Sequence, residues 1–127
     1  MRTQLAVANN HFLQPEVYNQ TFTLHGVTMI FFVAMPALLG LTVYITPLMI
    51  GANEMAFPRL NAFSFWITFF GGLLLYFSLA AGGAPDAGWF NYAPLNEHTY
   101  SPSSGVNYYC MGLVLAGIGS VTTVINL

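Results

Sequence analysis

Long runs of apolar residues alternate with short polar segments along this chain, and charged residues mark the ends of each run. No Asp, Glu, Lys or Arg occurs between Glu16 and Glu54, between Arg59 and Asp86, or after Glu97. A helix rises about 1.5 Å per residue, so about 20 apolar residues cross a hydrocarbon core of about 30 Å. Each uncharged span exceeds that length, which predicts three membrane-spanning helices.

We place these helices at about 22–50, 62–81 and 106–127, which makes residues 1–127 part of one all-α, multi-pass transmembrane bundle. Pro36 falls inside the first helix. A proline there frees a carbonyl that neighbouring groups in a membrane bundle must satisfy, and it predicts a kink.

The second and third helices are joined by "GGAPDAGWFNYAPLNEHTYSPSSG", a segment rich in Gly, Pro, Ser and Asn. Long ordered loops of this kind usually cover a site. In the third helix Gly112, Ala116 and Ser120 follow one another at i, i+4 and i+8. Such a stripe of small residues predicts close packing against another helix rather than catalysis.

The composition supports a membrane protein and excludes nucleic-acid binding. The chain is 56% hydrophobic and 5% charged, whereas about a quarter of a typical globular protein is charged. Two basic residues cannot form the cationic surface that phosphates require. The single cysteine, Cys110, predicts a buried thiol and no zinc or iron–sulfur site. Residues 1–20 are too polar for a targeting sequence.

His25 is the first candidate for chemistry, because an ionisable group inside a transmembrane span is costly and is a functional candidate by default. A neutral imidazole offers one nitrogen to a metal, and haem iron is a common partner. Phe22, Met29, Phe32 and Pro36 lie three, four, seven and eleven positions from it, on one face of a regular helix. The alternative is a histidine that only hydrogen-bonds another helix, and periodicity leaves both readings open.

Three segments together resemble subunit I of the haem-copper oxidases, membrane enzymes that reduce oxygen to water and pump protons. They are "HGVTMIFFVAMP", "PLMIGANEMAFPRLNAFSFW" and "GWFNYAPL". The resemblance runs from about Arg2 to Leu127 and covers the family's subunit from just before its second transmembrane helix into its fourth. It implies that a second haem, a copper held by three histidines, and a tyrosine lie beyond this segment, which therefore contains no catalytic residue and has no activity alone.

By the same resemblance, His25 is one axial ligand of the low-spin haem, and the second axial histidine is not in this chain. Neither His11 nor His98 lies in a predicted span. Trp89 matches a tryptophan whose indole N–H lies near the haem propionates, although an interfacial aromatic anchor is the simpler role. The resemblance also places the loop with Glu54 on the inner side of the membrane, and His25 and Trp89 toward the outer side.

The resemblance implies a path for proton uptake that opens at Glu54, where the family more often has aspartate. Asn61 matches an asparagine that helps to hold the water chain, whereas Val43 stands where another asparagine is expected. This is a departure from the usual path. The alternative makes Glu54 a solvated carboxylate beside Arg59 at the membrane edge.

The expected electron donor is cytochrome c, because quinol oxidases of this family usually carry a histidine where this chain has Val17, although Gln20 suits the quinol pattern. A quinol oxidase is the alternative. The expected partners are other oxidase subunits and the lipid of a bacterial plasma membrane or a mitochondrial inner membrane. Two readings from other classes are a transporter or channel in which His25 and Glu54 relay protons or ions without a haem, and a purely structural assembly subunit.

Overall fold

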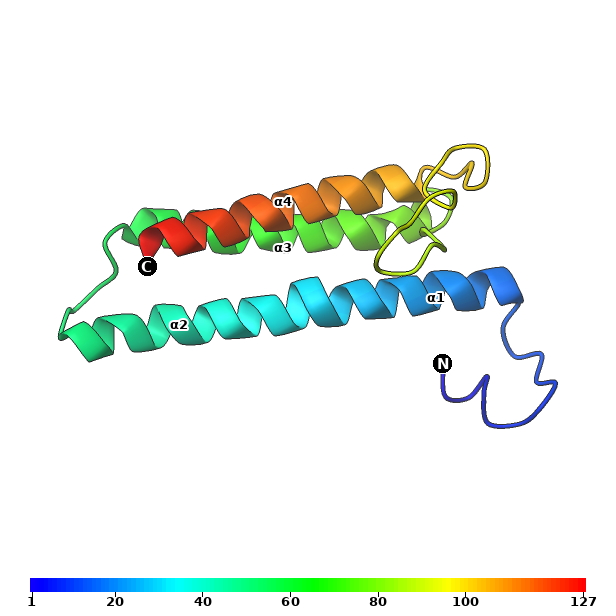
Figure 1. Ribbon diagram of the computed structural model, residues 1–127, viewed down its shortest axis with the longest axis horizontal. Coiled ribbons are helices and arrows are strands. Elements are labelled where there is room, and N and C mark those ends of the chain that lie inside the picture. The colour runs from blue at the N-terminus through cyan, green and yellow to red at the C-terminus, as the bar shows by residue number, and fades with distance from the viewer.

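A computed structural model describes residues 1–127, and every regular element in it is helical (Figure 1). The elements in chain order are α1 (Pro15–Val27), the π-helix η1 (Thr28–Ala34), α2 (Met35–Ile50), α3 (Pro58–Ala80) and α4 (Gly105–Asn126). The first three elements form one continuous helical stretch of 36 residues, so three stretches are long and apolar enough to cross a membrane. The predicted all-α transmembrane fold is confirmed.

Prolines set the starts of two helices earlier than the apolar pattern predicted. Pro15 opens α1 and Pro58 opens α3. Proline suits the first helical position because its ring presets the backbone and the N–H that it lacks has no partner there. The prediction began these helices at Phe22 and Ala62, since it followed the apolar run and left out the polar first turns.

The chain accommodates Pro36 with a wider helix just before it. The backbone N–H of Met35 donates to the carbonyl of Ile30, five residues back instead of four. Pro36 has no N–H with which to continue the ordinary pairing. The helix before Pro36 therefore widens into the seven-residue π-helix η1, while the expected kink stays a prediction.

Helices α3 and α4 lie side by side and run in opposite directions (Figure 1). The two backbones come close at Gly71 and Gly112, where a Cβ on either residue would lie 2.8 Å from the other's carbonyl oxygen. The predicted small residues Gly112 and Ala116 are buried in this contact, whereas Ser120 is only half-buried. Cys110, expected to be buried, is exposed because it lies off the face of α4 that packs on α3.

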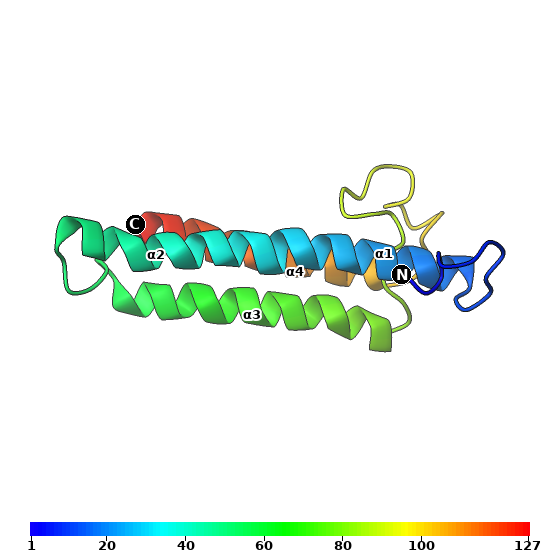
Figure 2. The same cartoon turned by 90° about the horizontal axis from the view of Figure 1, so that it is seen from below.

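The first helix runs alongside this pair, as the two views show (Figures 1 and 2). The main core cluster joins it to α3, the long loop and α4, through Leu24, Val27, Leu75, Ala84 and Tyr109. Most other large apolar side chains are exposed. Such surfaces suit lipid or neighbouring transmembrane helices, so the apolar core of this chain is concentrated where the long loop meets the helices.

Candidate functional site

The predicted site residues fall into two groups at opposite ends of the helices. The long loop after α3 lies at the α1 end, while the connection between α2 and α3 lies at the other end (Figures 1 and 2). His25 and Trp89 therefore belong to the first end, and Glu54 and Asn61 to the second.

Trp89 lies against α1 beside the residue that follows His25. A Cβ added at Gly26 would lie 3.2 Å from the Cβ of Trp89, so the missing side chain at Gly26 leaves room for the loop. The backbone N–H of Gly88 donates to Oγ1 of Thr23 at 3.0 Å, two residues before His25. These contacts bring the tryptophan of the loop next to the helical turn that carries the histidine.

His25 is exposed on α1, and Phe22 and Met29 beside it are exposed to 51% and 43%. An accessible imidazole nitrogen with bulky apolar neighbours has the donor chemistry that a haem requires. No group of three or more His, Cys, Asp or Glu residues gathers in this chain. The imidazole of His25 is therefore not part of a cluster of such side chains.

The apolar residues that were predicted to share one face with His25 fall into two groups. Phe32 and Pro36 line the groove between the first helix, α3 and α4, and the ring of Phe32 would lie 3.2 Å from a Cβ at Gly72. The π-helix explains the difference, because each of its turns takes in one more residue and rotates the following side chains to another direction. The prediction that these residues share the face of His25 assumed a regular α-helix and is wrong.

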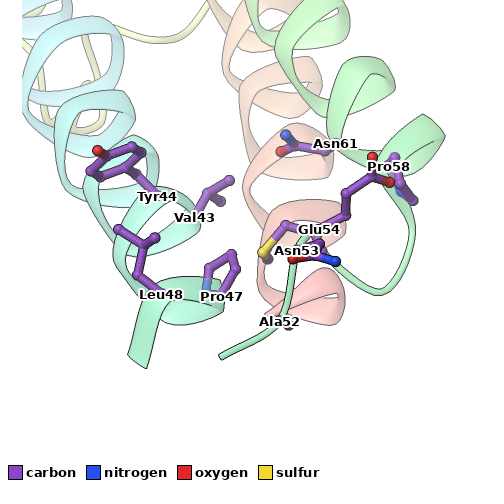
Figure 3. A pocket seen from close by; sticks show the side chains of 10 residues that line it. Val43, Tyr44, Pro47, Leu48, Ala52, Asn53, Glu54, Pro58 and Asn61 are labelled. Carbon is purple, nitrogen blue, oxygen red and sulfur yellow. The ribbon is translucent and has the colours of Figure 1, made fainter. Parts of the chain in front are cut away.

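At the other end, the helix termini and their connection border an open cavity of about 360 Å³ (Figure 3). Helix α2 ends at Ile50 and is followed by Gly51, whose φ of 72° lies in the left-handed region that glycine adopts without strain. The N–H of Phe57 then donates to Oδ1 of Asn126 at 2.7 Å, which ties the connection to the end of α4. The cavity is lined by Val43, Tyr44, Pro47, Leu48, Ala52, Asn53, Glu54, Met55, Pro58 and Asn61.

Glu54 and Asn61 share this cavity, and Val43 lines it from α2 (Figure 3). Glu54 and Arg59 are both exposed, and Asn61 is half-buried. A larger groove of about 1010 Å³ also includes Val43 and Asn61. Its polar lining beyond Asn61 consists of Thr28, Ser64, Thr68, Tyr76, Ser120 and Thr123. The pocket beside Glu54 thus adjoins a groove that carries hydroxyl groups and extends between the helices.

Sequence reasoning missed three residues that shape the end where the long loop meets α1: Thr23, Gly26 and Tyr109. The hydroxyl of Tyr109 donates to the backbone carbonyl of Trp89. Each residue looks ordinary in its helix, and its role depends on the path of a loop distant in sequence. The glycine next to His25 was the one available signal, because glycine in a helix often permits close approach of another segment.

Two comparisons with known proteins, one with family models and one with individual proteins, agree with each other. The model of the family described as "Cytochrome C and Quinol oxidase polypeptide I" matches residues 1–127. Quinol oxidase subunit 1 of Bacillus subtilis is 52% identical over 126 residues, which are 99% of this chain and 19% of that protein. The proteins named probable quinol oxidase subunit 1 in Staphylococcus epidermidis and Staphylococcus aureus are 49% and 48% identical with the same coverage.

The chain thus spans about a fifth of the length of the curated relatives that it matches, 19% in each case. These relatives are bacterial, and the chain has three helices of membrane-spanning length. Together they support the predicted location in a bacterial plasma membrane.

Proposed function

The chain belongs to the family of subunit I of the haem-copper oxidases, and we propose that it forms part of the single catalytic domain of a quinol oxidase that reduces oxygen to water. The observation that carries this proposal is 48–52% identity with proteins named quinol oxidase subunit 1, over 99% of this chain. Quinol thereby replaces cytochrome c, the donor that the sequence analysis favoured and that these relatives do not support.

A cytochrome c oxidase is the second candidate, and Val17 is the residue that favours it. Val17 is exposed in the first turn of α1, where the resemblance expects a histidine. Gln20, one turn further on, keeps a polar group at this end, with its Nε2 3.3 Å from the position of a Cβ at Gly83. One substituted position weighs less than the identity along the whole segment.

The test uses the assembled oxidase with the full-length subunit that contains this segment. Oxygen consumption is measured with a reduced membrane quinol and, separately, with reduced cytochrome c. The proposal expects turnover with quinol and none above background with cytochrome c. The reverse result would overturn the choice of donor and leave the family assignment intact.

Within this proposal, His25 holds the iron of the low-spin haem through one imidazole nitrogen, and the Trp89 indole donates toward the haem propionates. Two observations support these roles. His25 and Trp89 lie at the same end of the helices, and the imidazole is accessible. When bound, the haem supplies one-electron transfer. The second haem and the copper belong to parts of the subunit outside this segment.

The first prediction concerns His25. In the full-length enzyme, His25→Ala should abolish the visible absorption of the low-spin haem, because the iron loses an axial ligand. His98→Ala is the matched control, since His98 is exposed in the long loop and outside the helices. An unchanged spectrum in His25→Ala would contradict the proposed ligation and favour a transporter or structural role for the histidine.

We further propose that Glu54 and Asn61 take part in proton uptake from the inner side. The shared cavity supports this role, because a carboxylate and an amide at its wall can hold water in hydrogen-bonded contact. The hydroxyl groups of the adjoining groove extend the same polar environment. Val43 contributes only a hydrocarbon side chain where the resemblance expects an amide.

A further inference from the structure

The hydroxyl groups of Thr28 and Tyr76 form the one hydrogen bond in this chain that joins side chains of two membrane-spanning helices. Their oxygen atoms lie 2.5 Å apart. Thr28 is the first residue of η1, and Tyr76 lies near the C-terminal end of α3. Both residues line the groove between the helices. Within a membrane little water competes for such a bond, so the two hydroxyls are each other's natural partners.

The hydroxyl of Thr28 is directed differently from most threonine hydroxyls of these helices. The common arrangement is a bond to a backbone carbonyl three or four residues back, and it is adopted by Thr21, Thr23, Thr42, Thr68, Thr122 and Thr123. Thr28 instead bonds a side chain 48 positions away in the sequence. Its contact therefore belongs to the packing of the first helix on α3 and not to the local geometry of one helix.

The backbone of Thr28 is bonded to the turn that carries His25. The N–H of Thr28 donates to the carbonyls of both His25 and Leu24. Hydrogen bonds thus lead from the phenol of Tyr76 through Thr28 to the carbonyl of His25. A hydrogen bond depends on angle as well as distance, so a rotation of this turn about the helix axis would break the contact with Tyr76.

The apolar contacts beside this pair do not fix that rotation equally well. Val27 and Leu75 are fully buried in the core cluster, but the burial of apolar surface is non-directional. The helix also changes to wider turns at Thr28, so the regular pairing that would keep α1 in phase with the following residues ends there. A directional contact at this residue therefore restrains what the apolar core leaves free.

We propose that Thr28 and Tyr76 are positioning residues that hold the turn of His25 at one rotation relative to α3 and so set the direction of its imidazole. The inference rests on the proposed function, in which this imidazole ligates the low-spin haem. Both residues act through the backbone of the turn. Groups around a metal ligand commonly fix the orientation of its ring in this way.

The first measurement is the melting temperature of the assembled enzyme with the full-length subunit, in a double-mutant cycle. Thr28→Val and Tyr76→Phe each remove one hydroxyl and should each lower it. The double variant should fall no further than the weaker of the two, because both changes break the same bond. Thr42→Val is the matched control, since its hydroxyl bonds only the carbonyls of Leu38 and Leu39 in its own helix. Fully additive losses would overturn the inference.

The second measurement is one that a merely structural role would not change. The electron paramagnetic resonance spectrum of a ferric low-spin haem depends on the direction of its axial imidazole planes. Thr28→Val and Tyr76→Phe should both shift its largest g value, in the same sense. Thr28→Ser keeps a hydroxyl and should stay near the wild-type value, as should Thr42→Val. Coupled melting temperatures with an unchanged g value would show that the pair only joins the helices, and the positioning role would be wrong.

The result with His25→Ala distinguishes failure of the inference from failure of the proposed function. If His25→Ala removes the low-spin spectrum but Thr28→Val and Tyr76→Phe leave the g value unchanged, the inference is wrong and the ligation stands. If His25→Ala leaves the spectrum intact, the proposed function fails and the positioning of a haem ligand fails with it. Should Thr28→Val not assemble with haem, Tyr76→Phe decides by the same spectrum, because it removes a single oxygen atom.

Discussion

Gly26 keeps the long loop in contact with the first helix because it has no side chain. Gly26→Ala would place a Cβ 3.2 Å from that of Trp89, closer than ordinary contact, so the loop must shift. Overpacking of this kind costs about 1–3 kcal/mol. Gly40→Ala, on the same continuous helix with nothing within 4 Å in this chain, should be neutral or stabilising by up to about 1 kcal/mol. Thermal unfolding of the two full-length variants in detergent compares them, and equal melting temperatures would contradict the contact.

Glu54 is the residue on which proton uptake from the inner side depends in our proposal. Glu54→Gln keeps the shape and removes the group that ionises, so turnover and proton uptake by the reconstituted full-length enzyme should fall at least tenfold, the equivalent of about 1.4 kcal/mol. Glu97→Gln is the control, because Glu97 is exposed in the long loop at the other end. Unchanged proton uptake in Glu54→Gln would support the solvated-carboxylate reading.

The sequence identified most clearly the site residues that stand in an unusual setting. His25 drew attention because an ionisable group in an apolar span is expensive, and the resemblance then suggested roles for Glu54, Asn61 and Trp89. Thr23 and Tyr109 carried no such signal. A threonine and a tyrosine are ordinary in helices, and only the folded loop reveals their partners.

The pairing of α3 with α4 depends on glycine at the point where the backbones meet. Gly112→Ala would place a Cβ 2.8 Å from the carbonyl oxygen of Gly71, and neither backbone can yield easily. We expect a loss of about 1–3 kcal/mol. Gly117→Ala lies on the same helix with nothing within 4 Å and should not destabilise. The yield of folded full-length subunit and its melting temperature measure both, and equal behaviour would show that the helices do not approach so closely.

At the level of elements, hydropathy predicted the helices well, but the face with which α4 packs on α3 was predicted less well. The length of the three apolar spans and their lack of charge identify the helices clearly. A stripe drawn at i, i+4 and i+8, however, drifts around the helix by about 80°, because each residue turns about 100°. The buried face instead alternates steps of three and four. It comprises Gly105, Tyr109, Gly112, Ala116, Gly119, Thr123 and Asn126. Ser120, the last position of the predicted stripe, lies outside this set and is only half-buried.

The whole molecule has two chemically different ends, which we expect on opposite sides of the membrane. Asn53 and Asn96 are exposed at the two ends. In a full-length subunit whose cysteines, Cys110 included, are replaced by serine, Asn96→Cys should react with a membrane-impermeant thiol reagent in intact cells. Asn53→Cys should react only in inverted vesicles. Labelling of both residues from one side would contradict the proposed orientation.

The separation of the two ends could be predicted from the sequence, because a single membrane-length helix, α3, lies between Glu54 and Trp89. The return of the long loop onto α1 could not. That contact depends on two hydrogen bonds and a close approach between distant segments, none of which leaves a periodic pattern.

The wide turns of η1 lie between α1 and α2, and they change the direction in which the side chains of α2 point relative to those of α1. Removing one residue from Thr28–Ala34 and restoring ordinary pairing would change the direction of the following helix little, because the wide turns absorb about one extra residue. If all seven residues took ordinary turns instead, the following helix would turn by about 100° relative to His25, and Val43 would leave the pocket wall that it shares with Asn61. The π-helix η1 thus sets the direction in which the side chains of α2 point relative to those of α1.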